Sequence, residues 1–207
     1  MQSSALGLVD WRRRTNEMYA DVRADTAHEA AHSRWRARRD AMFLHHPQTP
    51  LVDDDPIRDG GIPYWPYDPT LRFEVALTVP EAGTAEDRVV EAGDDGTLTM
   101  KLIGRVDLPA GIGDGLAGGL DVWWLHQYGG GIFIPLRDGT SGDGSYGGGR
   151  YLLDTAKGSW LGGEGDNIVL DLNYAYHPSC RYNPRWQCPL APPGNTITAR
   201  VEAGERL

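Results

Sequence analysis

The sequence predicts an α+β protein: a single β-rich domain, a sandwich or partly open barrel, with an N-terminal helical segment. The chain has 207 residues, enough to bury one sizeable core. Its 27 glycines and 14 prolines favour turns and short strands over long helices. Apolar residues recur at helical spacing near the N-terminus and alternate in most later segments. We expect residues 1–48 to form helices packed on the core and residues 49–207 to form the β-rich domain.

The helical segment is predicted over residues 8–46, where apolar side chains such as Trp11 and Tyr19 recur at roughly helical spacing. Thr26 and Glu29 fit a capping box, so a second helix is expected to begin there. The His46-Pro47 pair should end it.

The β-structure is expected after a proline- and aspartate-rich connection at residues 50–69. Two turns favour hairpins, one at residues 94–96 and one at residues 127–130, and residues 81–95 resemble an acidic turn region. Strands are predicted at residues 71–79, 97–108, 121–126, 131–136, 167–176 and 195–202.

Charge excludes some functions. The net charge is −9, which makes a nucleic-acid partner a poor fit. Residues 1–39 nevertheless carry eight arginines against five acids, a local balance of +3. This is either a solvated helix face or a surface for an acidic partner. No apolar run approaches the roughly 20 residues of a membrane span, and the N-terminus resembles no signal segment, so we expect a cytoplasmic protein without a membrane partner.

Polar side chains and glycines crowd into the loop at residues 133–151, which we interpret as the wall of a site for a small polar or anionic molecule. The glycine-rich turn at residues 142–149 lacks the spacing of a nucleotide-binding loop. Its amides can still cradle an anion beside an arginine. Alternatively, Arg150 forms a structural ion pair with Asp138 or Asp171. The candidate residues in the loop are Arg137, Asp138, Thr140, Ser141, Tyr146 and Arg150.

Asp171 and Asn173 extend this candidate site. On a strand they share one face, and buried polar groups need partners, so we expect them to face the same pocket as Asp138, Thr140 and Arg150. In an enzyme, Asp138 or Asp171 would serve as base. Arg137 and Arg150 would hold the anion, Thr140 and Ser141 would add hydroxyls, and Tyr146 with Asn173 would orient the substrate. No cofactor is assigned, and no metal belongs to this set.

Cys180 and Cys188 are the two cysteines of the chain, separated by seven residues. A structural pair of thiols or a disulfide is one interpretation, although the cytoplasm disfavours the disulfide. A metal pair completed by His177 and His126 is another, with C-x7-C spacing that is unusual for zinc. A redox pair or a cysteine nucleophile is the third.

Several of these motifs together resemble the bacterial and archaeal family DUF1684, whose function is unknown. They are residues 133–142, 146–151 and 171–176, the cysteine block with residues 192–195, the terminal residues 202–205, and an opening motif at residues 35–51. The resemblance covers nearly the whole chain and departs from the family at His177, usually asparagine, and at Gly144-Ser145. Because the family carries no known activity, two hypotheses stay open: an enzyme acting on a small polar molecule, or a non-catalytic binding or interaction module.

Overall fold

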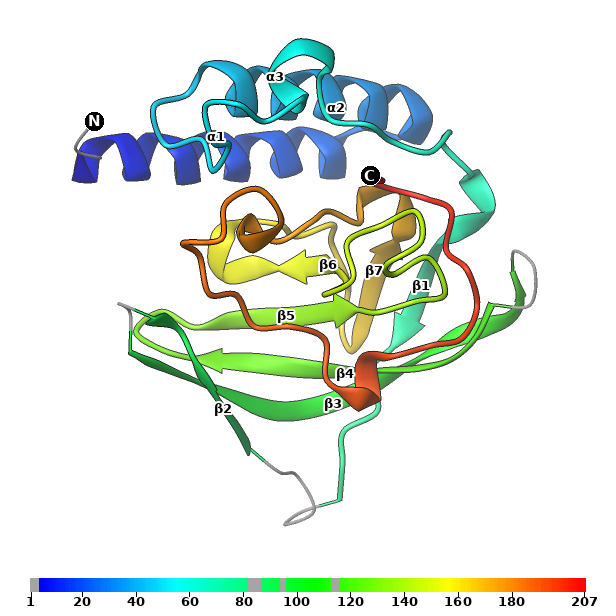
Figure 1. Ribbon diagram of the computed structural model, residues 1–207. Helices are drawn as coiled ribbons and strands as arrows, with labels where there is room; N and C mark the ends of the chain where they lie inside the picture. The colour runs from blue at the N-terminus through cyan, green and yellow to red at the C-terminus, as the bar shows by residue number, and fades with distance from the viewer. Residues whose placement is uncertain (1–3, 82–86, 94–95, 113–115) are drawn as a thin grey trace.

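The protein is built in two layers, with a pair of helices covering one side of a β-rich body. The computed structural model describes residues 4–81, 87–93, 96–112 and 116–207. Helices α1 (Ala5–Ala24) and α2 (His28–His45) are joined by a short turn and run back along each other beside the strands (Figure 1). A single helical turn, α3 (Ile57–Gly60), follows in the connection to the strands. This arrangement confirms the predicted α+β class.

Local hydrogen bonds and ion pairs explain where α1 begins and why its polar face is stable. The Ser4 hydroxyl accepts a hydrogen bond of 3.0 Å from the Gly7 N–H and so caps the first turn. Farther along, Arg13 pairs with Asp10 and Glu17, one turn away on either side. None of the described helices combines the length and the apolar character that crossing a membrane requires.

The start of α2 differs from the prediction. Its N-cap is Ala27 and no side chain caps it, so the capping box predicted from Thr26 and Glu29 is wrong. Instead, the Asp25 carboxylate accepts a hydrogen bond of 2.7 Å from the Ala27 N–H. This local bond forms the turn between the helices, as aspartates often do. The end of α2 is as predicted, with His46 as C-cap.

Most of the β-structure is one antiparallel sheet. Its strands lie in the order β2 (Asp87–Glu91), β3 (Thr97–Ile112), β4 (Leu116–His126), β5 (Gly131–Leu136) and β6 (Arg150–Asp154). A second, two-stranded sheet pairs β1 (Arg72–Ala76) with β7 (Asn167–Asp171). The described strands therefore form two separate sheets and no closed barrel.

The predicted strands at 97–108, 121–126 and 131–136 are confirmed within β3, β4 and β5, and residues 127–130 turn the chain between β4 and β5. The strand predicted at 71–79 is shortened to β1. The turn predicted at 94–96 includes residues outside the described ones. Two strands were not predicted: β2, within the expected acidic turn, and β6, which follows the glycine-rich loop.

The strand predicted at 167–176 stops at Asp171, because a local hydrogen bond competes with the sheet. The Asp171 carboxylate accepts the Asn173 N–H at 3.0 Å and caps a short 3-10 helix, η4 (Leu172–Tyr174). Asn173 therefore does not continue the strand alternation, and the prediction that it shares a strand face with Asp171 is wrong.

The strand predicted at 195–202 is also wrong. Only a single bridge, between Arg137 and Thr196, joins this segment to the chain after β5. One further backbone bond runs from the Gly139 N–H to the Ala199 carbonyl, at 2.8 Å. The segment then continues past the sheet to the helix layer, where the C-terminus lies (Figure 1).

Helices and strands share one hydrophobic core. Trp35 of α2 is 2% exposed and belongs to the same cluster as Leu153 of β6 and Leu170 of β7. Its ring lies 4.9 Å from that of Tyr174, in an edge-to-face arrangement. The helix pair is therefore part of the core rather than an appendage.

We predict that Trp35→Ala lowers the free energy of unfolding by about 3–5 kcal/mol, because it removes a buried ring at the contact between the two layers. Urea unfolding followed by circular dichroism should still show one cooperative transition. Val89→Ala, at a side chain that is 67% exposed, is the control and should change the free energy by less than about 0.5 kcal/mol. A separate early loss of helix signal, with the strands unaffected, would contradict a shared core.

Candidate functional site

Arg150, at the start of β6, is a fully buried arginine that binds the C-terminal segment. Its Nη1 donates to the main-chain carbonyls of Ala203 and, at 3.2 Å, Glu205. Its Nη2 donates to the Val201 carbonyl at 2.8 Å and to the Asp138 carboxylate at 3.1 Å. Both side chains of the Arg150–Asp138 ion pair are 0% exposed.

Asp138 and the hydroxyls after it complete a closed network. The Asp138 carboxylate accepts the Val201 N–H at 2.7 Å and the Thr140 hydroxyl at 2.9 Å. The Thr140 and Ser145 oxygens lie 2.9 Å apart, and the Ser141 hydroxyl accepts the Asp138 N–H at 3.2 Å. These side chains therefore satisfy one another and fasten the loop to the C-terminal segment.

This geometry favours the structural interpretation of the ion pair. The N–H groups on Nη1 and Nη2 of Arg150 all point at protein oxygens, and only its buried Nε lacks a partner among the described residues. The Trp65 ring covers the guanidinium, with its centroid 5.1 Å from Cζ. An arginine held in this way presents no open face to a ligand.

Asp171 and Asn173 belong to a different network, around the connection before β1. The Asn173 side-chain oxygen accepts the Asp68 N–H at 2.9 Å, and its Nδ2 donates to the Asp68 carbonyl at 2.8 Å. Nδ2 also donates to Asp171 at 2.8 Å, and the Tyr67 hydroxyl lies 3.5 Å from the same carboxylate. His32 contacts the Asn173 carbonyl at 2.9 Å. Burial raises the pKa of Asp171 to about 6.

The structure therefore divides the predicted site. Across the described residues, no hydrogen bond or ion pair joins Asp171 or Asn173 to Asp138, Thr140 or Arg150. The prediction that they face one pocket depended on a continuous strand to residue 176, and that strand ends at Asp171.

Two further candidates lie apart from both networks. The Arg137 side chain is exposed, and its backbone N–H binds the Asn195 carbonyl at 2.9 Å. Tyr146 stands edge-on to His177, with ring centroids 6.4 Å apart, and its N–H donates to His177 Nε2 at 3.2 Å. Burial raises the pKa of the Tyr146 hydroxyl, and Cys180 acts in the same direction.

Glu205, two residues before the last, is a buried carboxylate with three short hydrogen bonds. One carboxylate oxygen accepts from Arg39 Nε at 2.5 Å. The other accepts from the His177 N–H and the Tyr182 hydroxyl, each at 2.6 Å. Burial alone would raise the pKa of Glu205, but Arg39 and His177 bring it below its usual value, so the carboxylate stays ionised. It joins α2, the block after β7 and the C-terminus.

His177 is held neutral beside this carboxylate. Its Nε2 accepts the Tyr146 N–H, so the ring proton is on Nδ1, which lies 3.5 Å from a Glu205 oxygen. Burial lowers the pKa of His177 to about 4, although the Glu205 charge opposes the shift. Protonation would remove the acceptor of the Tyr146 amide as well as bury a charge.

Sequence reasoning missed this cluster as a site. Arg39 and Glu205 each stand in a motif that carries the family resemblance, but nothing in their spacing indicates that they meet, because 166 residues separate them. The terminal segment also contains Arg200, Glu202 and Arg206, so no local signal distinguishes Glu205 from its charged neighbours.

Next to the Glu205 cluster lies a cavity of about 70 Å³ between the helices and the strand layer. Roughly 10–15 Å³ of such volume accommodates one water, so a small ligand fits. The elements that wall it are α1, α2, β6, the short 3-10 helix η3 (Thr155–Lys157) and the block after β7. Its lining residues are Trp11, Thr15, Tyr19, Arg39, Phe43, Pro50, Tyr151, Lys157, Ser159, Tyr176, His177, Pro178 and Ser179.

Aromatic rings and a few polar groups line this cavity. The Tyr19 hydroxyl is completely buried and makes no hydrogen bond of normal geometry to a described residue. Ser159 lies close to Tyr19, and its hydroxyl oxygen accepts the Asp154 N–H at 2.9 Å. The hydrogen of the Ser159 hydroxyl is therefore still available for another acceptor. The Arg39 guanidinium stacks on Phe43 at 4.5 Å, and only its Nε is bonded, to Glu205, among the described residues.

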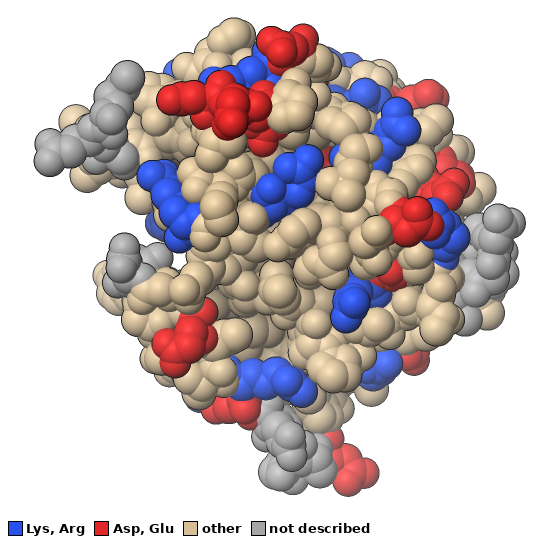
Figure 2. All heavy atoms as spheres, in the orientation of Figure 1, with Lys and Arg blue, Asp and Glu red and all other residues tan. Residues whose placement is uncertain are grey.

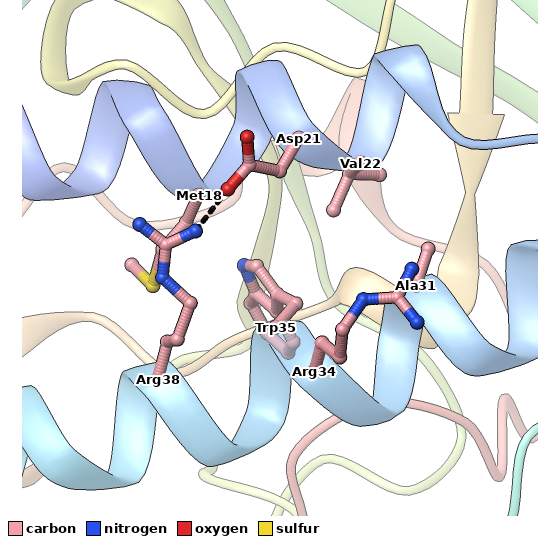
Figure 3. A pocket seen from close by; sticks show the side chains of 7 residues that line it. All are labelled: Met18, Asp21, Val22, Ala31, Arg34, Trp35 and Arg38. Carbon is pink, nitrogen blue, oxygen red and sulfur yellow. Dashed lines mark hydrogen bonds and ion pairs between the residues drawn. The ribbon is translucent and has the colours of Figure 1, made fainter.

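The arginine-rich helix layer is largely neutralised within the protein. Arg34 pairs with Asp25 and Arg38 pairs with Asp21. Figure 3 shows the Arg38–Asp21 pair across a hollow of about 60 Å³ between α1 and α2, with Trp35 beside it. In the view of Figure 2, basic and acidic side chains are interspersed on the face of the molecule. The contacts do not favour the alternative of a basic surface for an acidic partner.

The metal alternative is not supported. The described residues include no group of three or more histidines, cysteines and acids arranged to hold a metal ion. His177 turns its ring nitrogens to Tyr146 and Glu205 rather than to the cysteines. Cys180 and Cys188 are both free thiols, each partly exposed.

Together these features define an α+β protein whose helix layer, cysteine block and C-terminus meet at a buried carboxylate beside a cavity. The chain belongs to the family of proteins of unknown function DUF1684, which matches residues 60–206 and confirms the resemblance for that part. The match leaves out the helices, which contribute Arg39. An uncharacterized protein of Haloarcula marismortui, solved by NMR, is 32% identical with a TM-score of 0.59, over 86% of this chain and 94% of that one. No curated protein matches the chain.

We predict that His177 makes the protein less stable in acid. Its pKa of about 4 in the folded state lies below the usual 6.5, so the unfolded chain binds more protons between these values. Stability should fall as the pH drops from 6.5 to 4, by up to about 3 kcal/mol at 1.36 kcal/mol per pKa unit.

The matched variant is His177→Asn, which keeps a hydrogen-bond acceptor and removes the titration. Urea unfolding of both proteins between pH 7 and 4 measures the difference. The opposing effect of Asp171, whose raised pKa favours the folded state in acid, is common to both and cancels. If the free energy of unfolding changes with pH in the same way in both proteins, His177 has an ordinary pKa in the folded state and the prediction is wrong.

Proposed function

We propose that the protein binds a small polar or anionic molecule in the cavity between its helices and strands. The observation that carries this proposal is Tyr19, a residue that lines the cavity and whose buried hydroxyl has no hydrogen bond of normal geometry to the described residues. An unpaired buried hydroxyl costs about 1–3 kcal/mol, and a ligand oxygen that accepts its hydrogen would remove this cost.

The charges at the cavity favour an anion. Arg39 and Lys157 both line it, while the acids that pair with them, Glu205 and Asp154, are not among its lining residues. The Nη groups of Arg39 have donors to offer a carboxylate or phosphate. His177 is neutral and adds no charge of its own. A ligand of a few non-hydrogen atoms with an anionic group therefore matches the size and the chemistry.

The binding function is the leading proposal, and a catalytic one depends on it. Among the predicted catalytic residues, Tyr146 contacts the wall of the cavity. Its ring stands edge-on to His177, which lines the cavity. The catalytic roles predicted for Asp138 and Asp171, and the binding roles predicted for Arg137, Thr140, Ser141, Arg150 and Asn173, remain predictions. They receive no support from the cavity, since none of these residues lines it.

The proposal predicts that small anions stabilise the protein through this cavity. Native mass spectrometry of gently purified protein should first be used to detect a co-purifying molecule. Phosphate, formate, acetate and glycolate are then titrated by thermal shift, and at least one should raise the melting temperature with saturation. Tyr19→Phe removes one hydrogen bond to the ligand and should weaken binding about tenfold or more, equivalent to 1.4 kcal/mol.

The matched control is Tyr174→Phe. Tyr174 also carries a buried hydroxyl without a partner among the described residues, and its ring lies 6.3 Å from that of Tyr19, but it does not line the cavity. This variant should bind as the wild type does. The proposal fails if no molecule co-purifies and no anion shifts the melting temperature, or if Tyr19→Phe binds unchanged.

A further inference from the structure

A second and larger cleft lies between α1 and the five-stranded sheet, apart from the cavity beside Glu205. It holds about 360 Å³, which is within the range of ligand pockets. Its walls come from α1, β4, β5, η3 and the residues just after η3. The lining residues are Asn16, Arg23, Trp124, Ile132, Thr155, Gly158 and Trp160. None of them lines the cavity beside Glu205, so the two sites share no residue.

Protein contacts fix the sheet side of this cleft. Trp124 of β4 and Ile132 of β5 are cross-strand partners, so both side chains lie on one face of the sheet. A Cβ on Gly130 would lie 2.6 Å from the Trp124 ring, so the turn before β5 packs against the indole only because this residue is glycine. The Thr155 hydroxyl accepts the Ile132 N–H at 2.7 Å and fastens η3 to β5. The position of the Trp124 ring is therefore set before any ligand arrives.

The helix side is held against the same segment. A Cβ on Gly158 would lie 2.8 Å from the side chain of Asn16, so glycine lets α1 approach η3 closely. Farther along α1, Arg23 Nη1 donates to the Trp160 carbonyl at 2.6 Å. This bond places the Arg23 guanidinium beside the chain that carries the second tryptophan of the cleft.

The lining combines two indole rings with one cation and no acid. Trp124 is 37% exposed, so a ligand can reach its ring. Arg23 forms no ion pair with a described carboxylate, and among its donors only Nη1 bonds to a described residue. Its other N–H groups can therefore bind a carboxylate, while indole rings stack on planar aromatic rings.

We propose that this cleft binds an aromatic carboxylate, with the ligand ring against the indoles of Trp124 and Trp160 and the carboxylate on Arg23. A neutral sugar would stack on tryptophan but leave the Arg23 charge without a counter-charge. An aliphatic carboxylate would pair with Arg23 but leave both indole rings in water. The aromatic carboxylate is the class that uses both features, and a molecule of one or two rings fits the volume.

The test titrates the full, nitrogen-15-labelled protein with benzoate, cinnamate and 2-naphthoate. Two-dimensional NMR resolves the indole N–H signals, and Trp124→Phe and Trp160→Phe assign the two that matter. At least one probe should shift both signals with saturation, while the signal of the buried Trp35 stays in place. The amide of that probe lacks the charge and should bind at least about tenfold more weakly.

Two variants should weaken the binding of the same probe by about tenfold or more, Trp124→Ala through the lost ring and Arg23→Gln through the lost charge. Arg23→Lys keeps the charge and should lose less affinity than Arg23→Gln. The matched control is Trp186→Ala, because Trp186 is 39% exposed, much like Trp124, but does not line the cleft. Its affinity should equal that of the wild type. Circular dichroism establishes that each variant is folded.

The proposal is overturned if no probe at millimolar concentration gives saturable shifts of both the Trp124 and the Trp160 signals. It is also overturned if cyclohexanecarboxylate binds as tightly as benzoate, because the aromatic ring then contributes nothing, or if the amide binds as tightly as the acid. Tyr19→Phe should leave these shifts unchanged, which separates this cleft from the cavity beside Glu205.

Discussion

The Glu205 carboxylate is the contact on which the arrangement of the molecule depends. It is fully buried and receives hydrogen bonds from Arg39 of α2, from Tyr182 and from the His177 main chain. An ion without such partners would cost several kcal/mol to bury. The C-terminal segment, the helix layer and the cysteine block must therefore come together at one point for any of them to be stable there.

The same contacts build the cavity. Arg39 and His177 both bind Glu205 and both line the cavity, so its charge and shape are set by the buried carboxylate. Arg150 fastens the other end of the C-terminal segment through carbonyls of residues 201–205. The cysteine pair continues the block that starts at His177. The proposed binding cavity and the acid sensitivity predicted for His177 thus involve the same short stretch of chain.

Local patterns predicted the helices and the strand at 131–136, because periodicity and turn residues act over a few positions. They failed where a side chain competes with the backbone ladder, as at Asp171, which caps a turn and ends its strand. The polar residues of the glycine-rich loop were recognised, but their burial was not predictable, since Arg150 finds acceptors 51 to 55 residues away. Arg39 and Glu205 are 166 residues apart, beyond the reach of any spacing argument.

A double-mutant cycle on Arg39→Met and Glu205→Gln, measured by urea unfolding, tests the central role of this ion pair most directly. Each single change should cost about 3–5 kcal/mol, because it leaves the other buried group without its partner. The double variant should lose much less than the sum, with a coupling energy of about 2 kcal/mol or more. Additive losses, with a coupling below about 0.5 kcal/mol, would contradict the account by showing that the two residues stabilise the protein independently.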